Sequence, residues 1–119
     1  VKGYLLGAFP ATRDVFHHGG RLIISHAGGK GERNQKTTDA SVRALLENHR
    51  SGCPVLLLVD DRYELFPFDL GSHDVYMAVL GFYSIVHVWA EYEASTTGRV
   101  VRRKFAFQWC EDQGQPWWI

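Results

Sequence analysis

The feature that most constrains the fold is a pair of long alternating segments in the second half of the chain. Beyond Gly81, the apolar segment 75–92 alternates between two sets of side chains at a period of two. Residues 99–109 alternate in the same way, and the turn-like sequence EASTTG, residues 93–98, joins the two segments. This pattern predicts an antiparallel hairpin of two long strands, with a bend or bulge at Gly81.

Shorter extended segments are expected to complete the sheet. Residues 2–9 and 21–25 are strand-like, and the second segment contains the β-branched pair Ile23-Ile24. The unbroken apolar run VLLLV, residues 55–59, predicts a strand buried on both faces. Residues 63–68 contain a proline, which predicts an edge strand or a loop.

One helix is expected over residues 37–50. Thr38 or Asp39 can cap its N-terminus, apolar side chains recur at helical spacing, and Ser51-Gly52 ends it. A single principal helix beside several strands predicts an α+β protein. Its core is expected to be a mainly antiparallel curled sheet or a small β-barrel.

Length and composition indicate one globular domain. The chain has 119 residues, of which 45% are hydrophobic, and this is enough for a single core over residues 1–119. It begins at Val1, so we expect it to be a fragment of a longer protein. No apolar run approaches the roughly 20 residues that span a bilayer, so no membrane is expected among its partners. The two cysteines form no Cys-x-x-Cys pair, and no cofactor is expected.

Polar side chains flank the strand expected at residues 21–25, and paired glycines stand on both sides of it. The polar residues are Asp14, His17, His18, Ser25 and His26. Polar loops at the ends of a buried strand commonly form one side of a pocket. The three histidines could instead bind a metal, as in a metal-dependent nuclease, which would require them to converge with a carboxylate.

Five short motifs occur in order between Phe9 and Trp109. They are DV…G…LIIS…GG from Asp14, TDASVRALL at 38–46, SGCPV at 51–55, LGFYSIVHVWAE at 80–91 and RKFAF at 103–107. In this order they resemble the motifs of the SRA domain (SET and RING associated, also called YDG), a family with a PUA-like fold.

The resemblance implies a non-catalytic reader of double-stranded DNA that flips a modified cytosine, 5-methylcytosine or an oxidised form, into a pocket. Asp14 takes the place of the family's carboxylate, which accepts the cytosine amino hydrogen, and Ser25 that of its pocket threonine. Ile24 stands where the family has a stacking tyrosine, and Phe9 or Phe16 could supply the ring instead. By the same resemblance we expect a nuclear protein that acts in chromatin.

Charge is unevenly distributed although the net charge is zero. Residues 1–50 carry eight basic and four acidic groups (+4), residues 51–98 one and seven (−6), and residues 99–119 four and two (+2). One part of a neutral molecule can therefore be positive enough to bind a phosphate backbone. The basic residues that could contact phosphates, or could instead be ordinary solvated surface, are Lys30, Arg33, Lys36, Arg43, Arg102, Arg103 and Lys104.

The alternative function is a PUA-like protein-interaction or structural module that does not bind nucleic acid. The zero net charge and the acidic middle segment favour it. Trp117-Trp118 stand at the end of a chain that we expect to be a fragment, so they are expected to dock on a neighbouring domain of the same longer protein. The two hypotheses differ in salt dependence, because only contacts to DNA phosphates weaken steeply as salt rises.

Overall fold

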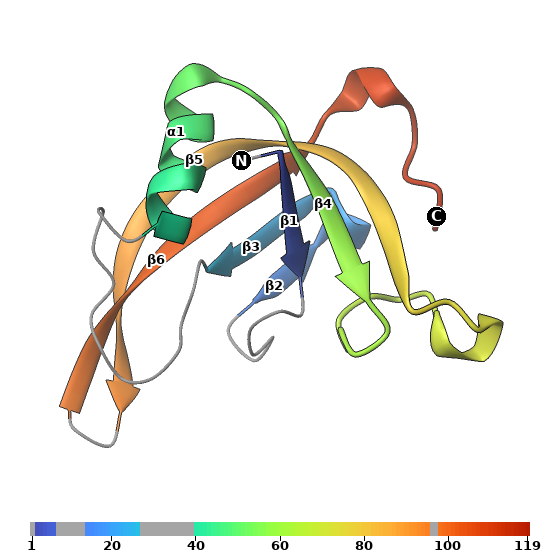
Figure 1. Cartoon of the computed structure of the whole chain (residues 1–119), viewed down its shortest axis with the longest axis horizontal. Helices are drawn as coiled ribbons and strands as arrows, with labels where there is room; N and C mark the ends of the chain where they lie inside the picture. Colours follow the sequence, from blue (N-terminus) through green and yellow to red (C-terminus); the bar gives the residue numbers. More distant parts are fainter. Residues whose placement is uncertain (1, 7–13, 27–39, 96–97) are drawn as a thin grey trace.

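The computed structural model describes residues 2–6, 14–26, 40–95 and 98–119 (Figure 1). Within these residues, six strands form one sheet and a single α-helix lies beside it. The elements are β1 (Gly3–Leu6), β2 (Val15–His17), η2 (His18–Gly20), β3 (Leu22–His26), α1 (Ala40–Ser51), β4 (Val55–Asp60), η3 (Gly71–His73), β5 (Met77–Ser95), β6 (Gly98–Trp109) and η4 (Glu111–Gln113).

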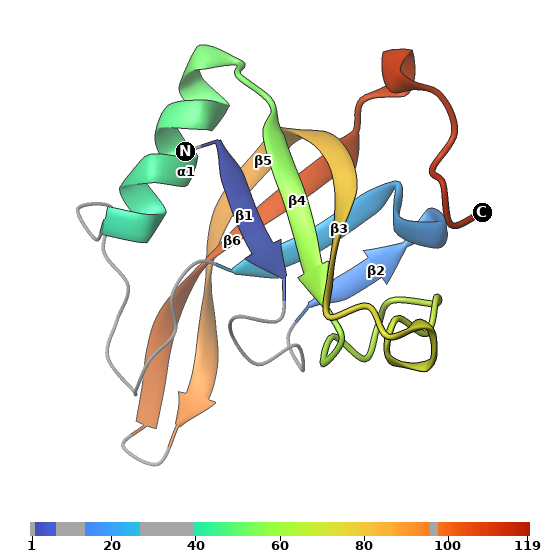
Figure 2. The same cartoon turned by 45° about the vertical axis from the view of Figure 1, so that its right-hand side comes forward.

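The sheet has the strand order β1-β4-β5-β6-β3-β2. β1 runs parallel to β4, and every other neighbouring pair is antiparallel. The sheet curls so that β1 and β4 cross over β3 and β2 (Figure 2), and the Tyr4 hydroxyl in β1 donates to the backbone carbonyl of His26 at the end of β3. The expected α+β curled sheet with one principal helix is confirmed. Over the described residues the sheet does not close into a barrel, since β1 and β2 are its two edges.

The predicted hairpin is confirmed, because β5 and β6 pair from Tyr83↔Trp109 to Ser95↔Gly98. The predicted bend at Gly81 is confirmed as well, since the pairing of β5 with β4 shifts register there. The φ angle of Gly81 is 149°, and a Cβ atom at this position would lie 2.6 Å from the Trp109 ring. Backbone conformation and close packing therefore both require glycine at the point where β5 curves.

The apolar core is formed by the strands of the curled sheet, by the loop after β4 and by α1. Val42 and Leu45 of α1 are buried in it, as their helical spacing predicted. The expected caps Thr38 and Asp39 lie outside the described residues. At the other end the helix reaches Ser51, and Gly52 follows with a φ of 73°, the left-handed conformation expected of a glycine C-cap.

The prediction that residues 55–59 are buried on both faces is wrong. Val55, Leu57 and Val59 are fully buried, whereas Leu56 and Leu58 between them are half-buried. The core covers one face of β4 and leaves the other partly open to solvent, so burial alternates along the strand. Residues 63–68 form turns and bends, which confirms the loop alternative for that segment.

The C-terminal residues 110–119 fold back onto this domain. The Trp118 indole donates to the carbonyl of Gly19 at 2.7 Å, and the Trp117 indole donates to that of Val79 at 2.9 Å. Both tryptophan rings also pack on Phe66. Trp117 and Trp118, which were expected to dock on a neighbouring domain, thus make contacts within this domain. No helix of the described residues has the length and apolarity needed to cross a membrane.

Candidate functional site

The antiparallel pairing of β2 and β3 places Asp14 beside Ser25. Val15 pairs with Ile24, so Asp14, which precedes Val15, lies opposite Ser25, which follows Ile24. The Ser25 hydroxyl donates to Asp14 Oδ1 at 2.9 Å, and Ser25 is almost fully buried while Asp14 is half-buried. The two residues that the sequence assigned to one pocket are thus brought into direct contact by strand pairing.

A third residue completes this arrangement from a distant part of the chain. Tyr63, in the loop that follows β4, donates its hydroxyl proton to Asp14 Oδ2 at 3.0 Å. The Tyr63 side chain is 4% exposed, so this hydrogen bond forms in the interior. Each carboxylate oxygen of Asp14 therefore accepts one hydrogen bond from the protein and keeps a second lone pair for another donor. Tyr63 could not be predicted as a partner of Asp14, because no local pattern in the sequence links the two residues.

Tyr4 also lies near Asp14 and Ser25, although it belongs to β1 at the opposite edge of the curled sheet. Its ring stacks on Phe107 of β6, with 5.6 Å between ring centroids, and its hydroxyl bonds to the carbonyl of His26. Burial raises the pKa of both Tyr4 and Tyr63 well above the ordinary tyrosine value, and the nearby Asp14 charge adds to this. Both phenols are therefore protonated at neutral pH and act as donors.

The pKa of Asp14 is raised, and burial of its carboxyl group is the main cause. Hydrogen bonds from Ser25 and Tyr63 oppose this effect, as do the charges of His26 and Lys104. In its ionised form this carboxylate is a well-oriented hydrogen-bond acceptor in a region with little water. Such a group suits a ligand that presents an N–H donor, for example the exocyclic amine of a cytosine.

The three residues considered for stacking on the cytosine ring, Ile24, Phe16 and Phe9, lie in different places. Ile24 pairs with Val15 on the face opposite to Ser25, so it does not lie with the Asp14 cluster. Phe16 is on the same face as Asp14, and its ring packs against Tyr63 at 6.5 Å and Phe66 at 6.2 Å. Phe9 lies outside the described residues. Phe16 is therefore the predicted aromatic residue that the structure brings toward Asp14.

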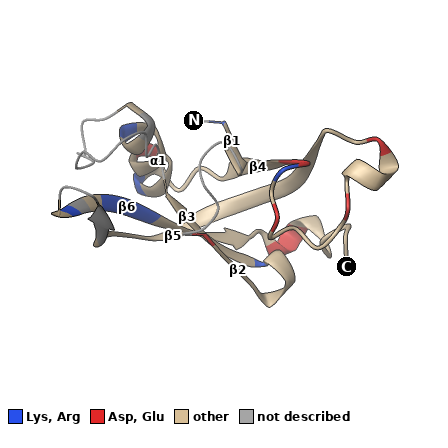
Figure 3. Cartoon of the chain, turned by 90° about the horizontal axis from the view of Figure 1, so that it is seen from below, with Lys and Arg blue, Asp and Glu red and all other residues tan. Residues whose placement is uncertain are grey.

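The predicted phosphate-contacting residues are also divided. Lys30, Arg33 and Lys36 lie outside the described residues. In Figure 3, Lys and Arg residues lie along β6 and on α1, where Arg43 is exposed, and others lie outside these two elements. Arg102 and Lys104 are each only 4% exposed and Arg103 is half-buried, contrary to the exposure expected of phosphate contacts. Alternation along β6 puts Arg102 and Lys104 on the same covered side.

The three histidines of the metal alternative do not converge. His17 and His18 are neighbours, with 5.8 Å between ring centroids, and His17 pairs with Leu22 at the start of β3. His26 is buried at the other end of β3, opposite Lys104. Within the described ranges no group of three His, Cys, Asp or Glu side chains is placed to hold a metal ion. The geometry therefore does not support a histidine-based nuclease centre.

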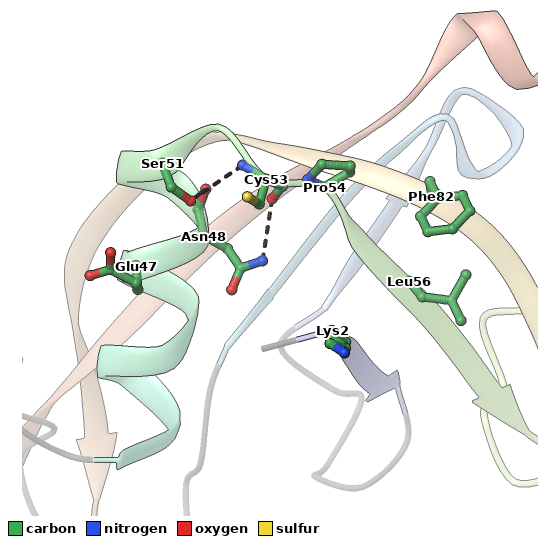
Figure 4. A pocket seen from close by; sticks show the side chains of 8 residues that line it. All are labelled: Lys2, Glu47, Asn48, Ser51, Cys53, Pro54, Leu56 and Phe82. Carbon is green, nitrogen blue, oxygen red and sulfur yellow. Dashed lines mark hydrogen bonds between the residues drawn. The ribbon is translucent and has the colours of Figure 1, made fainter.

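A separate cavity of about 470 Å³ lies between the C-terminal end of α1 and the strands β1, β4 and β5 (Figure 4). The Asn48 amide bonds to the Cys53 carbonyl at its rim. None of the residues around Asp14 contributes to this cavity. Its lining residues are Lys2, Glu47, Asn48, Ser51, Cys53, Pro54, Leu56 and Phe82.

Comparison with known proteins gives structural matches but no sequence matches. No family model and no curated protein matches the chain. A modification-dependent TagI restriction endonuclease is similar in structure, with a TM-score of 0.73, 21% identity and 94% of this chain covered. This chain spans 39% of that endonuclease.

Solved SRA domains of SUVH5 are also similar. The SUVH5 domain in complex with hemi-methylated CG DNA has a TM-score of 0.66 and 17% identity, with 97% of this chain and 67% of that chain covered. The same domain bound to fully hydroxymethylated CG DNA has a TM-score of 0.64 and 18% identity, with 96% and 66% covered. The strand order, the single helix and these near-complete superpositions agree with the five sequence motifs, and together they show that this chain has the fold of the SRA domain.

Proposed function

We propose that this domain binds double-stranded DNA and holds a modified cytosine, turned out of the duplex, against Asp14. The observation that carries the proposal is the carboxylate of Asp14, held by Ser25 and Tyr63 in the interior of an SRA fold. The exocyclic amine of cytosine is a hydrogen-bond donor. It would donate to a lone pair of an Asp14 carboxylate oxygen that Ser25 and Tyr63 do not use. Thymine and guanine do not present the same donor in that position.

Extrusion of the base is part of the proposal because Asp14 lies in the interior. A base within the duplex stack cannot reach a side chain that is half-buried beside fully buried neighbours. Unstacking and unpairing cost a few kcal/mol, which contacts in the pocket and along the backbone would offset. Support also comes from the neighbours of known function, since the SUVH5 domains were solved with methylated or hydroxymethylated DNA. Nuclear residence and action in chromatin stay predictions.

The proposal assigns binding, without catalysis, to this domain. Asp14 is tied to Ser25 and Tyr63, and the histidines nearest to it along the chain do not form a metal centre with it. A modified duplex incubated with the domain and Mg²⁺ is therefore expected to stay intact on a denaturing gel. Cleavage at the modified base would contradict this assignment.

The experiment is a fluorescence-anisotropy titration of matched duplexes that carry cytosine, 5-methylcytosine or 5-hydroxymethylcytosine at one position. We expect tighter binding to a modified duplex. Asp14→Asn keeps the size of the side chain but removes its charge. Because the proposal places only the modified base against Asp14, the substitution should weaken binding of the modified duplex about tenfold or more, as for a lost hydrogen bond to a charged group, and so reduce that preference. Asp112→Asn, an exposed carboxylate in η4, is the matched control and should bind like the wild type. Equal binding of all three duplexes, or a preference that survives Asp14→Asn, would overturn the proposal.

A protein-interaction module remains the second candidate, and one observation favours it. Apolar side chains on β5 and at the C-terminal end are about half exposed: Met77 52%, Val79 49%, Phe82 50% and Trp117 47%. Exposed apolar residues that gather in this way are typical of protein interfaces. Failure of the domain to bind any duplex at low salt would favour this function over DNA binding.

A further inference from the structure

The hairpin of β5 and β6 extends beyond the strand next to it. β3 ends at His26, which pairs with Lys104 of β6. From there β5 and β6 continue together for six further residue pairs, from Ala90↔Arg103 to Ser95↔Gly98. We call residues 90–95 and 98–103 the β5–β6 ribbon, and in Figure 1 it projects away from the rest of the sheet.

The ribbon starts next to the Asp14 cluster. Lys104 pairs with His26, which follows Ser25 in β3, and Ser25 bonds to Asp14. Arg99 lies five positions before Lys104, which corresponds to about 17 Å along a strand. DNA that delivers a base to Asp14 must pass close to this starting point, and it carries a phosphate charge for about every 1.7 Å of its axis. The ribbon is therefore long enough to follow several phosphates on one side of the site.

The end of the ribbon carries an exposed cation held by an aromatic ring. The guanidinium carbon of Arg99 lies 4.8 Å from the centroid of the Tyr92 ring. Arg99 is exposed and Tyr92 is 70% exposed, so neither side chain has a role in the apolar core. Stacking on an aromatic ring restricts the guanidinium while leaving its N–H donors at the edge available, and this geometry suits phosphate oxygens.

The charge of the ribbon also favours binding to a DNA backbone. Between residues 90 and 104, β6 contributes four basic groups and β5 two acidic ones, a balance of +2. The Trp89 indole donates to the carboxylate of Glu91, which engages one of the two acidic groups within its own strand. Because Arg102 and Lys104 are buried near the start of the ribbon, Arg99 is the exposed cation at its far end.

We propose that the β5–β6 ribbon is a second DNA contact, in which Arg99 on Tyr92 binds backbone phosphates beside the base held at Asp14. This inference rests on the proposed function and adds Arg99 and Tyr92, which are neither among the predicted phosphate contacts nor part of the Asp14 cluster. A contact to phosphates carries no information about the base, so it contributes affinity without selectivity. Base recognition at Asp14 and backbone binding at Arg99 are then separable by mutation.

The test compares Arg99→Gln and Tyr92→Ala with a control, Arg50→Gln. Arg50 is an equally charged residue on α1 whose side chain is 77% exposed and paired with Glu47. Anisotropy titrations use the 5-methylcytosine and cytosine duplexes at several salt concentrations, and circular dichroism checks that each variant is folded. Arg99→Gln should raise the Kd for both duplexes by a similar factor, about threefold to tenfold. The slope of log Kd against log salt should fall by about 0.9, which corresponds to one lost phosphate contact.

Tyr92→Ala keeps the charge of Arg99 but removes the ring on which it stacks. We therefore expect a smaller loss of affinity for both duplexes than in Arg99→Gln, and an unchanged preference for the 5-methylcytosine duplex. Arg50→Gln should leave the affinity and the salt slope at wild-type values. An Arg99→Gln variant that binds with unchanged affinity and salt slope, while Asp14→Asn still abolishes the preference, would overturn the ribbon contact and leave the proposed function standing. A wild-type domain that binds no duplex would overturn both, and a changed preference in Arg99→Gln would show that the ribbon reads the base.

Discussion

The buried environment of Asp14 favours ligand binding but lowers the stability of the folded protein once the carboxyl group is ionised. Burial raises its pKa, so the folded protein binds a proton more readily than the unfolded chain at this position. Between the unfolded and folded pKa values the folded state therefore carries more protons, and the free energy of unfolding falls as pH rises through that window. Ionisation of the buried Asp14 therefore costs stability, which the hydrogen bonds from Ser25 and Tyr63 partly offset.

Tyr63→Phe tests the role of the second donor to Asp14. Because the hydrogen bond from Tyr63 lowers the pKa of Asp14, its loss should raise that pKa further. Binding of a modified duplex should weaken in both proteins as pH falls through the Asp14 pKa, since protonation removes the charged acceptor. In Tyr63→Phe this decline should begin at higher pH. The measurement is the pH profile of Kd, with the exposed Tyr76→Phe as control, and superimposable profiles would contradict the role assigned to Tyr63.

At the scale of single elements, β5 combines two functions in one long strand. Its first part curves at Gly81 to pack on β4 and the core, and its last part forms the projecting ribbon with β6. The curve is held from outside by Gln113, whose side-chain amide bonds to both the N–H and the carbonyl of Phe82. This pair of hydrogen bonds imitates a neighbouring strand at the place where the bulge interrupts regular pairing.

Gly81→Ala is expected to destabilise the domain by about 2–3 kcal/mol. A Cβ atom would meet the Trp109 ring at 2.6 Å and the Gln113 side chain at 2.8 Å, in addition to strain from the positive φ. Gly98→Ala is the matched control, because its φ is 127° but its Cβ would have no neighbour within 4 Å. Urea unfolding should show a cost of about 1 kcal/mol for the control. Equal losses in the two variants would show that packing at Gly81 is unimportant.

At the scale of the whole molecule, the C-terminal residues 110–119 join parts of the fold that are distant in the chain. Trp118 packs between Trp109 and Phe66, with ring centroids 5.8 Å and 5.4 Å away, and bonds to the carbonyl of Gly19. The turn before β3, the loop after β4 and the end of β6 are thereby held together. The loop after β4 is the one that carries Tyr63, so this segment also supports the candidate site.

Trp118→Ala should therefore cost more stability than Trp117→Ala. Trp118 is half-buried against the core, whereas Trp117 is 47% exposed. We expect a loss of about 2–4 kcal/mol for Trp118→Ala, in the lower range for large-to-small changes in cores, and about half of that or less for Trp117→Ala. Thermal and urea unfolding measure both. The reverse order would mean that Trp117 is the residue that anchors the C-terminal segment.

Local patterns in the sequence determined much of the architecture. Period-two alternation predicted the β5–β6 hairpin, Gly81 predicted its bulge, and the Ser51-Gly52 pair predicted the end of α1. Each of these features depends on residues close together in the chain, where backbone preference and side-chain period act directly. The roles of Asp14 and Ser25 in one base pocket were implied by the resemblance to the SRA motifs, and the pairing of β2 with β3 is what brings the two residues together.

Only the tertiary structure decided which side chains share a face and which distant residues meet. Pairing register put Ile24 on the face away from Ser25, and the curl of the sheet brought Tyr63 to Asp14 across 49 positions of sequence. Burial of Arg102 and exposure of Arg99, two basic residues of the same strand, were likewise visible only in the folded structure. Contacts of this kind depend on how separate elements pack, and no pattern within one segment of the sequence encodes them.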